Sequence, residues 1–412
     1  MVKKIIIIGA GIAGINAIKA IRERDSEVLI DLLSDEPFFP YNRMKLSKGL
    51  FELELSKSLL QKEDWYVQNR INLHLGAAVR QIDVQKQTVT VNHGTIFDYD
   101  KLLIATGAQN RRPEIAISNQ AKLYTLRKMD DARQILRDMD HTKQIVNIGG
   151  GIQGLETAWT LQQHQKKVMI AEIQERLMPL QLDQKGSHFL KHLAEDAGVE
   201  VLTDTPVIGI DQTSIQTSEG KRIHYDMAIY SIGIKPELMI VKDTTIRTNR
   251  GILVNERMET NIPNIYAAGD TAEYEGKIFG LWNIAVEQGK IAGYNLIGHP
   301  ATYQPVVPVT TLNGFGITLF SMGDVNEDNA SYSVFHEDIR KNTYIRLFIN
   351  NDRIIGAIMM GDTGKSPLLK RAIENQTLVE DISWNQTSVE DIFQTLKMNK
   401  NKEYSNEHHS IL

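Results

Sequence analysis

The stretch that decides the fold is KIIIIGAGIAG at residues 4–14, an apolar run that ends in a glycine-rich turn. Ile5 to Ile8 are continuously apolar, which predicts a central parallel strand buried on both faces. Apolar residues recur at helical spacing through residues 13–24, and residues 28–33 predict a second strand. The pattern therefore predicts a strand–turn–helix–strand unit of the dinucleotide-binding type.

Each glycine of this first turn has its own expected role. Gly9 permits a tight bend after the strand, Gly11 lets the backbone approach a pyrophosphate, and Gly14 lets the helix pack closely on the strand. The N-terminus of the following helix then faces the phosphates. The turn is therefore expected to cradle the pyrophosphate of a dinucleotide.

The same pattern begins again with an apolar strand at residues 144–148. It continues through the turn GGGIQG at 149–154 and a predicted helix at 155–164 to a strand at 168–171. One such motif alone is weak evidence, but two copies in strand–turn–helix context predict two dinucleotide sites. The glycines that take the same three roles in the second turn are Gly149, Gly151 and Gly154.

An acidic residue is expected where the second strand of each unit ends, because its carboxylate holds the adenosine ribose hydroxyls. Asp35 and Glu36 lie near this distance in the first unit, and Asp31 is the alternative, expected to be only a strand residue. Glu172 takes this place in the second unit. A carboxylate there repels a 2′-phosphate and favours NADH over NADPH, although Arg176 and two nearby lysines temper this preference.

Composition excludes several classes of protein. The 412 residues have a net charge of −5, so no broad cationic surface is expected for nucleic acid. No apolar run reaches the ~18 residues of a membrane-spanning helix, and glycines break the apolar start before it can act as a signal peptide. The protein is expected in the cytoplasm. It has no cysteine, which excludes disulfides, thiolate metal ligands, iron–sulfur clusters and cysteine nucleophiles.

No metal site is expected. His188 and His192 stand four residues apart on a predicted helix, but no third ligand lies near them in the sequence. They are expected to face solvent.

The pattern changes at about residue 306 to an antiparallel one, with residues 344–349 and 354–360 predicting two strands of an α+β module. Residues 387–398 predict an amphipathic helix in which Thr387 and Glu390 have capping-box spacing. This helix either covers the protein's own core, as most such helices do, or binds a partner. The remaining residues predict a tail.

Several further motifs carry a resemblance to a known family. They are PYNR at 40–43 with LSK at 46–48, ATG at 105–107, GGGIQGLE at 149–156, IGIKPE at 232–237, YAAGD at 266–270 and GD at 361–362. With them the chain resembles the rubredoxin reductase and ferredoxin reductase branch of the FAD-dependent pyridine nucleotide-disulfide oxidoreductases. The flavin module of assimilatory nitrite reductases is similar too.

The resemblance implies an α/β fold of two nested Rossmann-like domains with a C-terminal α+β domain. It implies that the first unit holds FAD and that the second unit, inserted into the FAD domain, binds the nicotinamide cofactor. The expected boundaries are 1–112 with 245–305 for the FAD domain, 113–244 for the NAD(P)H domain, 306–370 for the α+β domain, and 371–412 for a helical extension and tail.

The resemblance also implies individual roles. Asp270 bonds a ribityl hydroxyl of FAD, Arg43 and Arg127 contact the flavin nucleotide, and the backbone of Val79 meets the adenine. The other expected cofactor contacts are Thr106, Gly107, Gly233, Gly269 and Trp282, the last at the edge of the flavin pocket.

Two residues are expected to act on the chemistry itself. The resemblance implies that Lys48 lies beside the isoalloxazine and pairs with Glu156. An ammonium there would stabilise the negative charge of reduced flavin, and the carboxylate would keep the lysine oriented and charged. By itself, Lys48 would suggest only a solvated loop lysine.

The missing cysteine is a departure from the wider family, whose disulfide reductases need a redox cysteine near the flavin. Electrons must therefore leave the flavin directly. The expected function is to pass electrons from NADH, or less favourably NADPH, through FAD to rubredoxin or a ferredoxin-like protein. The alternatives are an NAD(P)H oxidase or quinone reductase, and a non-enzymatic interaction protein switched by the nucleotide.

Overall fold

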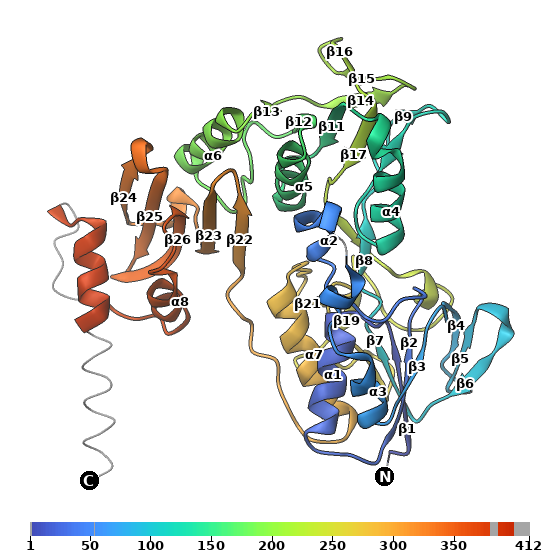
Figure 1. Cartoon of the computed structure of the whole chain (residues 1–412). Helices are drawn as coiled ribbons and strands as arrows, with labels where there is room; N and C mark the ends of the chain where they lie inside the picture. Colours follow the sequence, from blue (N-terminus) through green and yellow to red (C-terminus); the bar gives the residue numbers. More distant parts are fainter. Residues whose placement is uncertain (1, 53, 380–385, 399–412) are drawn as a thin grey trace, which may run out of the picture. The chain divides into compact units, whose positions relative to one another are not determined.

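The computed structural model describes residues 2–52, 54–379 and 386–398 (Figure 1). The chain divides into two compact units. Unit 1 comprises Met1–Arg111, Arg127–Met129 and Gly233–Pro305, and unit 2 comprises Arg112–Leu126, Asp130–Ile232 and Val306–Leu412.

Unit 1 is built on a five-stranded, wholly parallel sheet in the order β20-β7-β1-β2-β3. The central strand is the apolar run that opens the chain, and its Ile5 to Ile7 side chains are fully buried. The strands are β1 (Lys4–Ile8), β2 (Leu29–Leu33), β3 (Ile71–His74), β7 (Lys101–Ile104) and β20 (Ile265–Ala267).

Two helices of unit 1 pack on one another without side chains between their backbones. A Cβ atom on Gly289 would lie 2.2 Å from the carbonyl oxygen of Ala13, and one on Gly293 would lie 2.4 Å from that of Ala17. These helices are α1 (Ile12–Arg22) and α7 (Trp282–Leu296). Glycine at both positions is therefore required for α1 to approach α7 (Figure 1).

Unit 2 contains a second five-stranded parallel sheet, in the order β10-β17-β11-β12-β13, with helix α5 (Ile152–Gln163) after the second glycine turn. β11 is the central strand here, as β1 is in unit 1. The strands are β10 (Leu123–Tyr124), β11 (Gln144–Ile148), β12 (Lys167–Ala171), β13 (Val199–Leu202) and β17 (Met227–Tyr230). Both predicted strand–turn–helix–strand units are confirmed.

In each of the two parallel sheets, an aspartate that the sequence analysis missed binds the backbone at the start of the central strand. Asp100 accepts hydrogen bonds from the backbone N–H groups of Lys3 and Lys4, at 2.7 and 2.9 Å. Asp226 does the same for Lys143 and Gln144, at 2.8 and 2.9 Å. Both aspartates follow a tyrosine and precede a strand of their sheet, so the repeated Tyr-Asp pair was the available signal.

Replacing Asp100 with alanine is expected to lower the free energy of unfolding by about 1 kcal/mol, discounted because the side chain is exposed. The N–H groups of Lys3 and Lys4 lower the pKa of Asp100, so its stabilising contribution is present above the ordinary aspartate pKa and is lost as pH falls through the lowered value. Chemical denaturation of both proteins at neutral and acidic pH measures this. Asp98→Ala, which removes only a 3.4 Å contact with Lys4, is the control. A difference that persists undiminished in acid would contradict the explanation.

Unit 2 also contains a five-stranded antiparallel sheet in the order β22-β23-β26-β25-β24. Residues of its inner face pack with helix α8 (Ser366–Glu374) and with residues 389–398, which are helical. The strands are β22 (Val309–Gly314), β23 (Ile317–Gly323), β24 (Tyr332–Asp338), β25 (Thr343–Asn350) and β26 (Arg353–Gly361). The predicted C-terminal α+β module is confirmed.

The helix at 389–398 covers the protein's own core, since Ile392 and Phe393 are almost fully buried. The predicted capping box of Thr387 with Glu390 is wrong. Ser388 and Asp391 form it instead: Asp391 N–H donates to Ser388 Oγ at 3.2 Å, and Ser388 N–H donates to the Asp391 carboxylate at 2.9 Å. Glu390 instead pairs with Lys365. The predicted tail at 399–412 lies outside the described residues.

The remaining elements form small sheets and connecting helices. They are α2 (Lys45–Lys48), α3 (Glu63–Gln68), α4 (Met129–Asp138), α6 (Gln184–Asp196), β4 (Val79–Asp83), β5 (Thr88–Val91), β6 (Ile96–Asp98), β8 (Ala108–Asn110), β9 (Ala116–Ile117), β14 (Val207–Ile210), β15 (Ser214–Thr217), β16 (Arg222–His224), β18 (Ile234–Pro236), β19 (Ile252–Val254) and β21 (Ala272–Tyr274). Among the described helices, none is long and apolar enough to span a bilayer.

Candidate functional site

Unit 1 contains a cavity of about 850 Å³ at the carboxyl ends of β1 and β2. This is the edge at which parallel sheets bind nucleotides. Most residues predicted to contact FAD line it. They are Gly9, Gly11, Asp35, Glu36, Arg43, Val79, Thr106, Gly107, Arg127, Gly269, Asp270 and Trp282.

The three glycines of the first turn are required for different reasons. Gly9 has φ +103°, and a Cβ on it would lie 2.2 Å from the carbonyl oxygen of Ala105. A Cβ on Gly14 would lie 2.3 Å from the carbonyl oxygen of Gly9. Apart from its two chain neighbours, no residue comes within 4 Å of the Cβ position of Gly11, which lines the cavity. The open space beside Gly11, at the start of α1, fits a pyrophosphate.

One carboxylate of the predicted acidic pair is buried in a network of hydrogen bonds. Glu36 accepts a hydrogen bond from the hydroxyl of Tyr41 at 2.7 Å and pairs with Arg43 at 2.6 Å. Burial raises the pKa of Tyr41 and outweighs the opposing charge of Arg43, so its hydroxyl stays protonated as a donor. Asp35 is more exposed and pairs with Lys128 at 2.5 Å. Tyr41 and Lys128 also line the cavity and were missed by the sequence analysis.

A second ion pair lies in the same cavity. Arg127 donates from Nη2 to the carboxylate of Asp270 at 2.8 Å and from Nε to the carbonyl oxygen of Ala108 at 3.0 Å. Arg43 donates to the backbone oxygen of Arg127 at 3.2 Å. The structure thus brings both predicted arginines and Asp270 into one group. Asp31, by contrast, is a buried strand residue that accepts from His74, as expected.

The second glycine turn, in unit 2, repeats the geometry of the first. Gly149 has φ +108°, a Cβ on Gly154 would lie 2.1 Å from the carbonyl oxygen of Gly149, and the Cβ position of Gly151 is open. The sequence analysis missed Asn147, a polar residue in an apolar strand, whose side-chain amide donates to the Gly149 carbonyl at 2.7 Å.

Glu172 directly follows the last residue of β12, close to the predicted place, and faces the second turn. Its carboxylate accepts hydrogen bonds from the backbone N–H of Gly150 at 2.5 Å and of Gln174 at 2.8 Å. The turn and the acidic residue are therefore fixed relative to one another. Arg176 donates to the backbone oxygens of Leu182 and Pro179, at 2.5 and 3.4 Å.

Three predicted residues lie elsewhere. Lys48 ends α2 in unit 1, whereas Glu156 is buried on α5 in unit 2, so their pairing stays a prediction. Gly233 has φ +99°, and its carbonyl oxygen accepts from the N–H of Arg111 at 2.9 Å, next to the short ladder of β8 and β18.

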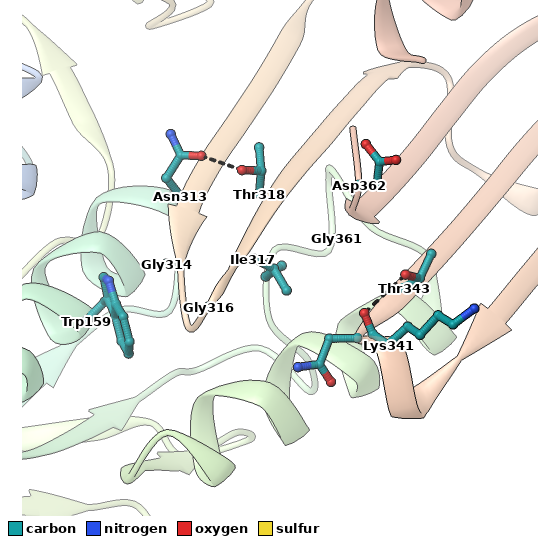
Figure 2. Close-up of a pocket in the computed structure, with 11 residues that line it drawn as sticks. Trp159, Asn313, Gly314, Gly316, Ile317, Thr318, Lys341, Thr343, Gly361 and Asp362 are labelled. Atoms are coloured by element: carbon teal, nitrogen blue, oxygen red, sulfur yellow. Dashed lines mark hydrogen bonds between the residues drawn. The ribbon is translucent and has the colours of Figure 1, made fainter. Parts of the chain in front are cut away.

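Unit 2 has a second cavity, of about 730 Å³, at one end of the antiparallel sheet. Figure 2 shows Trp159 of α5 on one side, the β22–β23 turn next to it, and Lys341, Thr343 and Asp362 across from them. Trp159 packs edge-on against Phe315, with 5.4 Å between ring centroids. His188 and His192 are exposed, as expected, and the described residues contain no group of three metal-ligating side chains.

The family model described as pyridine nucleotide-disulphide oxidoreductase matches residues 3–289, and that of the rubredoxin NAD+ reductase C-terminal domain matches residues 308–377. An NADH-rubredoxin oxidoreductase of Clostridium acetobutylicum is 33% identical over 381 residues, 92% of this chain and 97% of that protein. A nitrite reductase [NAD(P)H] of Bacillus subtilis is 30% identical over 388 residues, 92% of this chain and 48% of that protein.

Solved structures agree with these matches. The crystal structure of the NADH:rubredoxin oxidoreductase from Clostridium acetobutylicum has a TM-score of 0.79 at 31% identity, covering 95% of this chain and 99% of that one. A covalent putidaredoxin reductase–putidaredoxin complex has a TM-score of 0.86 at 25% identity, covering 96% and 99%. The predicted fold of Rossmann-like nucleotide-binding domains with a C-terminal α+β domain is confirmed.

Proposed function

Because the chain belongs to the pyridine nucleotide-disulphide oxidoreductase family, we propose that it passes electrons from NADH through FAD to a small iron–sulfur protein of the rubredoxin or ferredoxin class. The observation that carries the proposal is the presence, in one chain, of two glycine-turn nucleotide sites and a C-terminal domain matched by the rubredoxin reductase model. The chain is a flavin-dependent oxidoreductase, and its predicted cofactors, FAD and NADH, are those of the family.

We assign FAD to the cavity of unit 1, whose donor set fits it. Bound FAD would accept a hydride from NADH and release electrons one at a time. Arg43 and Arg127 supply cationic donors for the diphosphate region, and Asp270 supplies an acceptor for a ribityl hydroxyl. The proposed FAD domain is 1–112 with 245–305, followed by the proposed domains 113–244, 306–370 and 371–412.

The proposed acceptor of the adenosine ribose in unit 2 is Glu172, which gives a preference for NADH. Its carboxylate is already fixed by the turn, and it would repel a 2′-phosphate. Arg176, which the sequence analysis expected to temper this preference, instead donates to backbone oxygens of its own loop. NADPH is therefore the weaker substrate.

The proposed reacting residues are Lys48 and Glu156. Lys48 would stabilise negative charge that develops on the flavin ring, and Glu156 would hold the lysine charged and oriented. Because the full sequence contains no cysteine, electrons do not pass through a disulfide on their way to the acceptor. The acceptor is proposed to dock near Trp282, which lines the FAD cavity, and the reaction is proposed to take place in the cytoplasm.

The test is anaerobic stopped-flow reduction of the purified yellow enzyme by NADH and by NADPH, followed by mixing with oxidised rubredoxin or ferredoxin. The expected result is fast flavin bleaching, faster with NADH, and then reduction of the iron–sulfur protein. Failure to reduce any small iron–sulfur protein would overturn the acceptor proposal. Turnover with oxygen or quinones alone would favour the oxidase or quinone reductase alternative. Slow reduction of the flavin by NADH without turnover would favour a nucleotide-switched interaction protein.

A further inference from the structure

A buried aspartate joins the nucleotide module of unit 2 to the antiparallel sheet. Asp183 caps the N-terminus of α6 by accepting the N–H of Gly186 at 3.1 Å, and its side chain has 0% exposure. It also accepts the hydroxyl of Tyr344 at 2.7 Å and Nη1 of Arg346 at 2.6 Å, both from β25. A buried carboxylate is stable only with such partners.

The cation of this cluster has partners at both of its Nη atoms. The Arg346 side chain is 9% exposed, and its Nη1 also donates to Glu327 at 2.8 Å while Nη2 donates to Ser333 at 2.9 Å. Burial, followed by the hydrogen bond and charge of Asp183, raises the pKa of Tyr344, so its hydroxyl remains a donor. The cluster of Asp183, Tyr344 and Arg346 is a fixed anchor between the sheet and α6.

The anchor stands at one end of the loop that follows Glu172, residues 173–182. This loop is held at three further points by polar contacts. The hydroxyl of Ser321 on β23 donates to the backbone oxygen of Gln181 at 2.6 Å, and the hydroxyl of Ser187 on α6 donates to that of Leu177 at 2.6 Å. Within the loop, Arg176 donates to the backbone oxygen of Leu182.

The middle of the loop reaches the second glycine turn. The side chain of Leu177 is fully buried and lies against Gly150, where a Cβ would come within 2.6 Å of its Cδ2. Gly150 in turn donates to Glu172 at 2.5 Å. Continuous contacts therefore run from β25 through Asp183 and the loop to the proposed ribose acceptor.

We infer that Arg346, Tyr344 and Asp183 are positioning residues for the adenosine half of the nicotinamide dinucleotide. None of them belongs to the glycine turn. They hold the loop at 173–182 in the conformation that packs Leu177 on Gly150 and keeps Glu172 facing the turn. The C-terminal sheet thereby sets the affinity of a nucleotide site to which it contributes no direct ligand. This inference rests on the proposed assignment of the second turn to NADH.

The test uses the FAD-loaded enzyme and ADP-ribose, which lacks the nicotinamide, with Kd measured by calorimetry. Arg346→Met is expected to raise the Kd for ADP-ribose and the KM for NADH roughly tenfold, the scale of remote coupling, while kcat at saturating NADH and the FAD content stay near wild type. Tyr344→Phe, which keeps the ion pair, is expected to give a smaller rise. Arg346→Lys, which keeps a cation beside Asp183, should have a Kd for ADP-ribose close to that of the wild type. Glu172→Ala supplies the reference for full loss of the ribose acceptor.

Arg346→Met leaves a buried charge on Asp183 and can destabilise the whole module. The double variant Asp183→Asn with Arg346→Met removes both charges and is expected to fold while showing the same rise in Kd. Lys365→Met is the control, because it breaks the 2.5 Å ion pair with Glu390 elsewhere in unit 2. It should leave the Kd for ADP-ribose unchanged.

Folded Arg346→Met and double variants with wild-type Kd for ADP-ribose would overturn the inference. So would a rise in the KM for NADH without a rise in the Kd for ADP-ribose, because the effect would then lie outside the adenosine half. A wild-type enzyme that binds no ADP-ribose would instead overturn the proposed function itself.

Discussion

Replacing Gly11 with valine is expected to abolish retention of FAD while leaving the protein folded. Apart from its two chain neighbours, no residue comes within 4 Å of the Cβ position of Gly11, so the chain accommodates the new side chain, which then fills the space assigned to the pyrophosphate. We expect flavin occupancy, measured by visible absorbance per purified protein, to fall at least tenfold, roughly 1.4 kcal/mol or more. Circular dichroism should remain that of the wild type.

The second turn provides the matched control. Gly151 has an equally open Cβ position, so Gly151→Val is expected to retain FAD and lose binding of NADH. Gly14→Val differs from both, since its Cβ would lie 2.3 Å from a backbone oxygen, and it should disrupt the fold together with the flavin. A Gly11→Val protein that stays yellow while Gly151→Val is colourless would reverse the assignment of the two sites.

Replacing Lys48 with methionine is expected to slow flavin reduction by NADH about 100-fold, the scale for removing one electrostatic donor from a reacting site. The volume of the side chain is nearly kept, whereas the ammonium that would balance charge on the flavin is lost. The measurement is the stopped-flow rate constant at saturating NADH, with FAD content checked by absorbance.

Lys45 offers a control on the same short helix. Its Nζ donates to the backbone oxygen of Lys57 at 2.6 Å, and no role beside the flavin is predicted for it, so Lys45→Met removes a comparable charge away from the proposed site. We expect its reduction rate to stay within a factor of about two of wild type. Equal rates for Lys48→Met and wild type would leave Lys48 a solvated lysine, the alternative that its sequence position alone favours.

The two nucleotide-binding units could be predicted from the sequence because the bend of the chain and the binding of a pyrophosphate both require glycine at the same positions. Gly9 and Gly149 must bend the chain after an apolar strand, and the structure gives them nearly equal φ angles, +103° and +108°. The carboxylate of Glu172 lies where its spacing from the turn predicted. The parallel and antiparallel strands could also be told apart in the sequence. Parallel strands buried on both faces are continuously apolar, whereas antiparallel strands alternate polar and apolar residues.

The rest depends on contacts between residues far apart in the chain. Glu36 and Asp35 are adjacent in sequence, yet only the fold decides that Glu36 is buried against Tyr41 and Arg43. Asp183 and Arg346 carry no motif, and their pairing exists only once α6 meets β25. The capping box failed by a single residue because Thr387 and Ser388 are both good caps, and only the helix start at residue 389 distinguishes them.

The contact of α1 with α7 sets the earliest point at which unit 1 can finish folding during synthesis. Ala13 and Ala17 of α1 pack against Gly289 and Gly293 of α7, which are synthesised more than 250 residues later. Helix α1 therefore leaves the ribosome long before the helix that covers it. The nucleotide sheet of unit 2 needs only residues 123–230 and can close first. A premature stop within the last turns of α7 would therefore expose an apolar helix face, marking the truncated chain for aggregation or proteolysis.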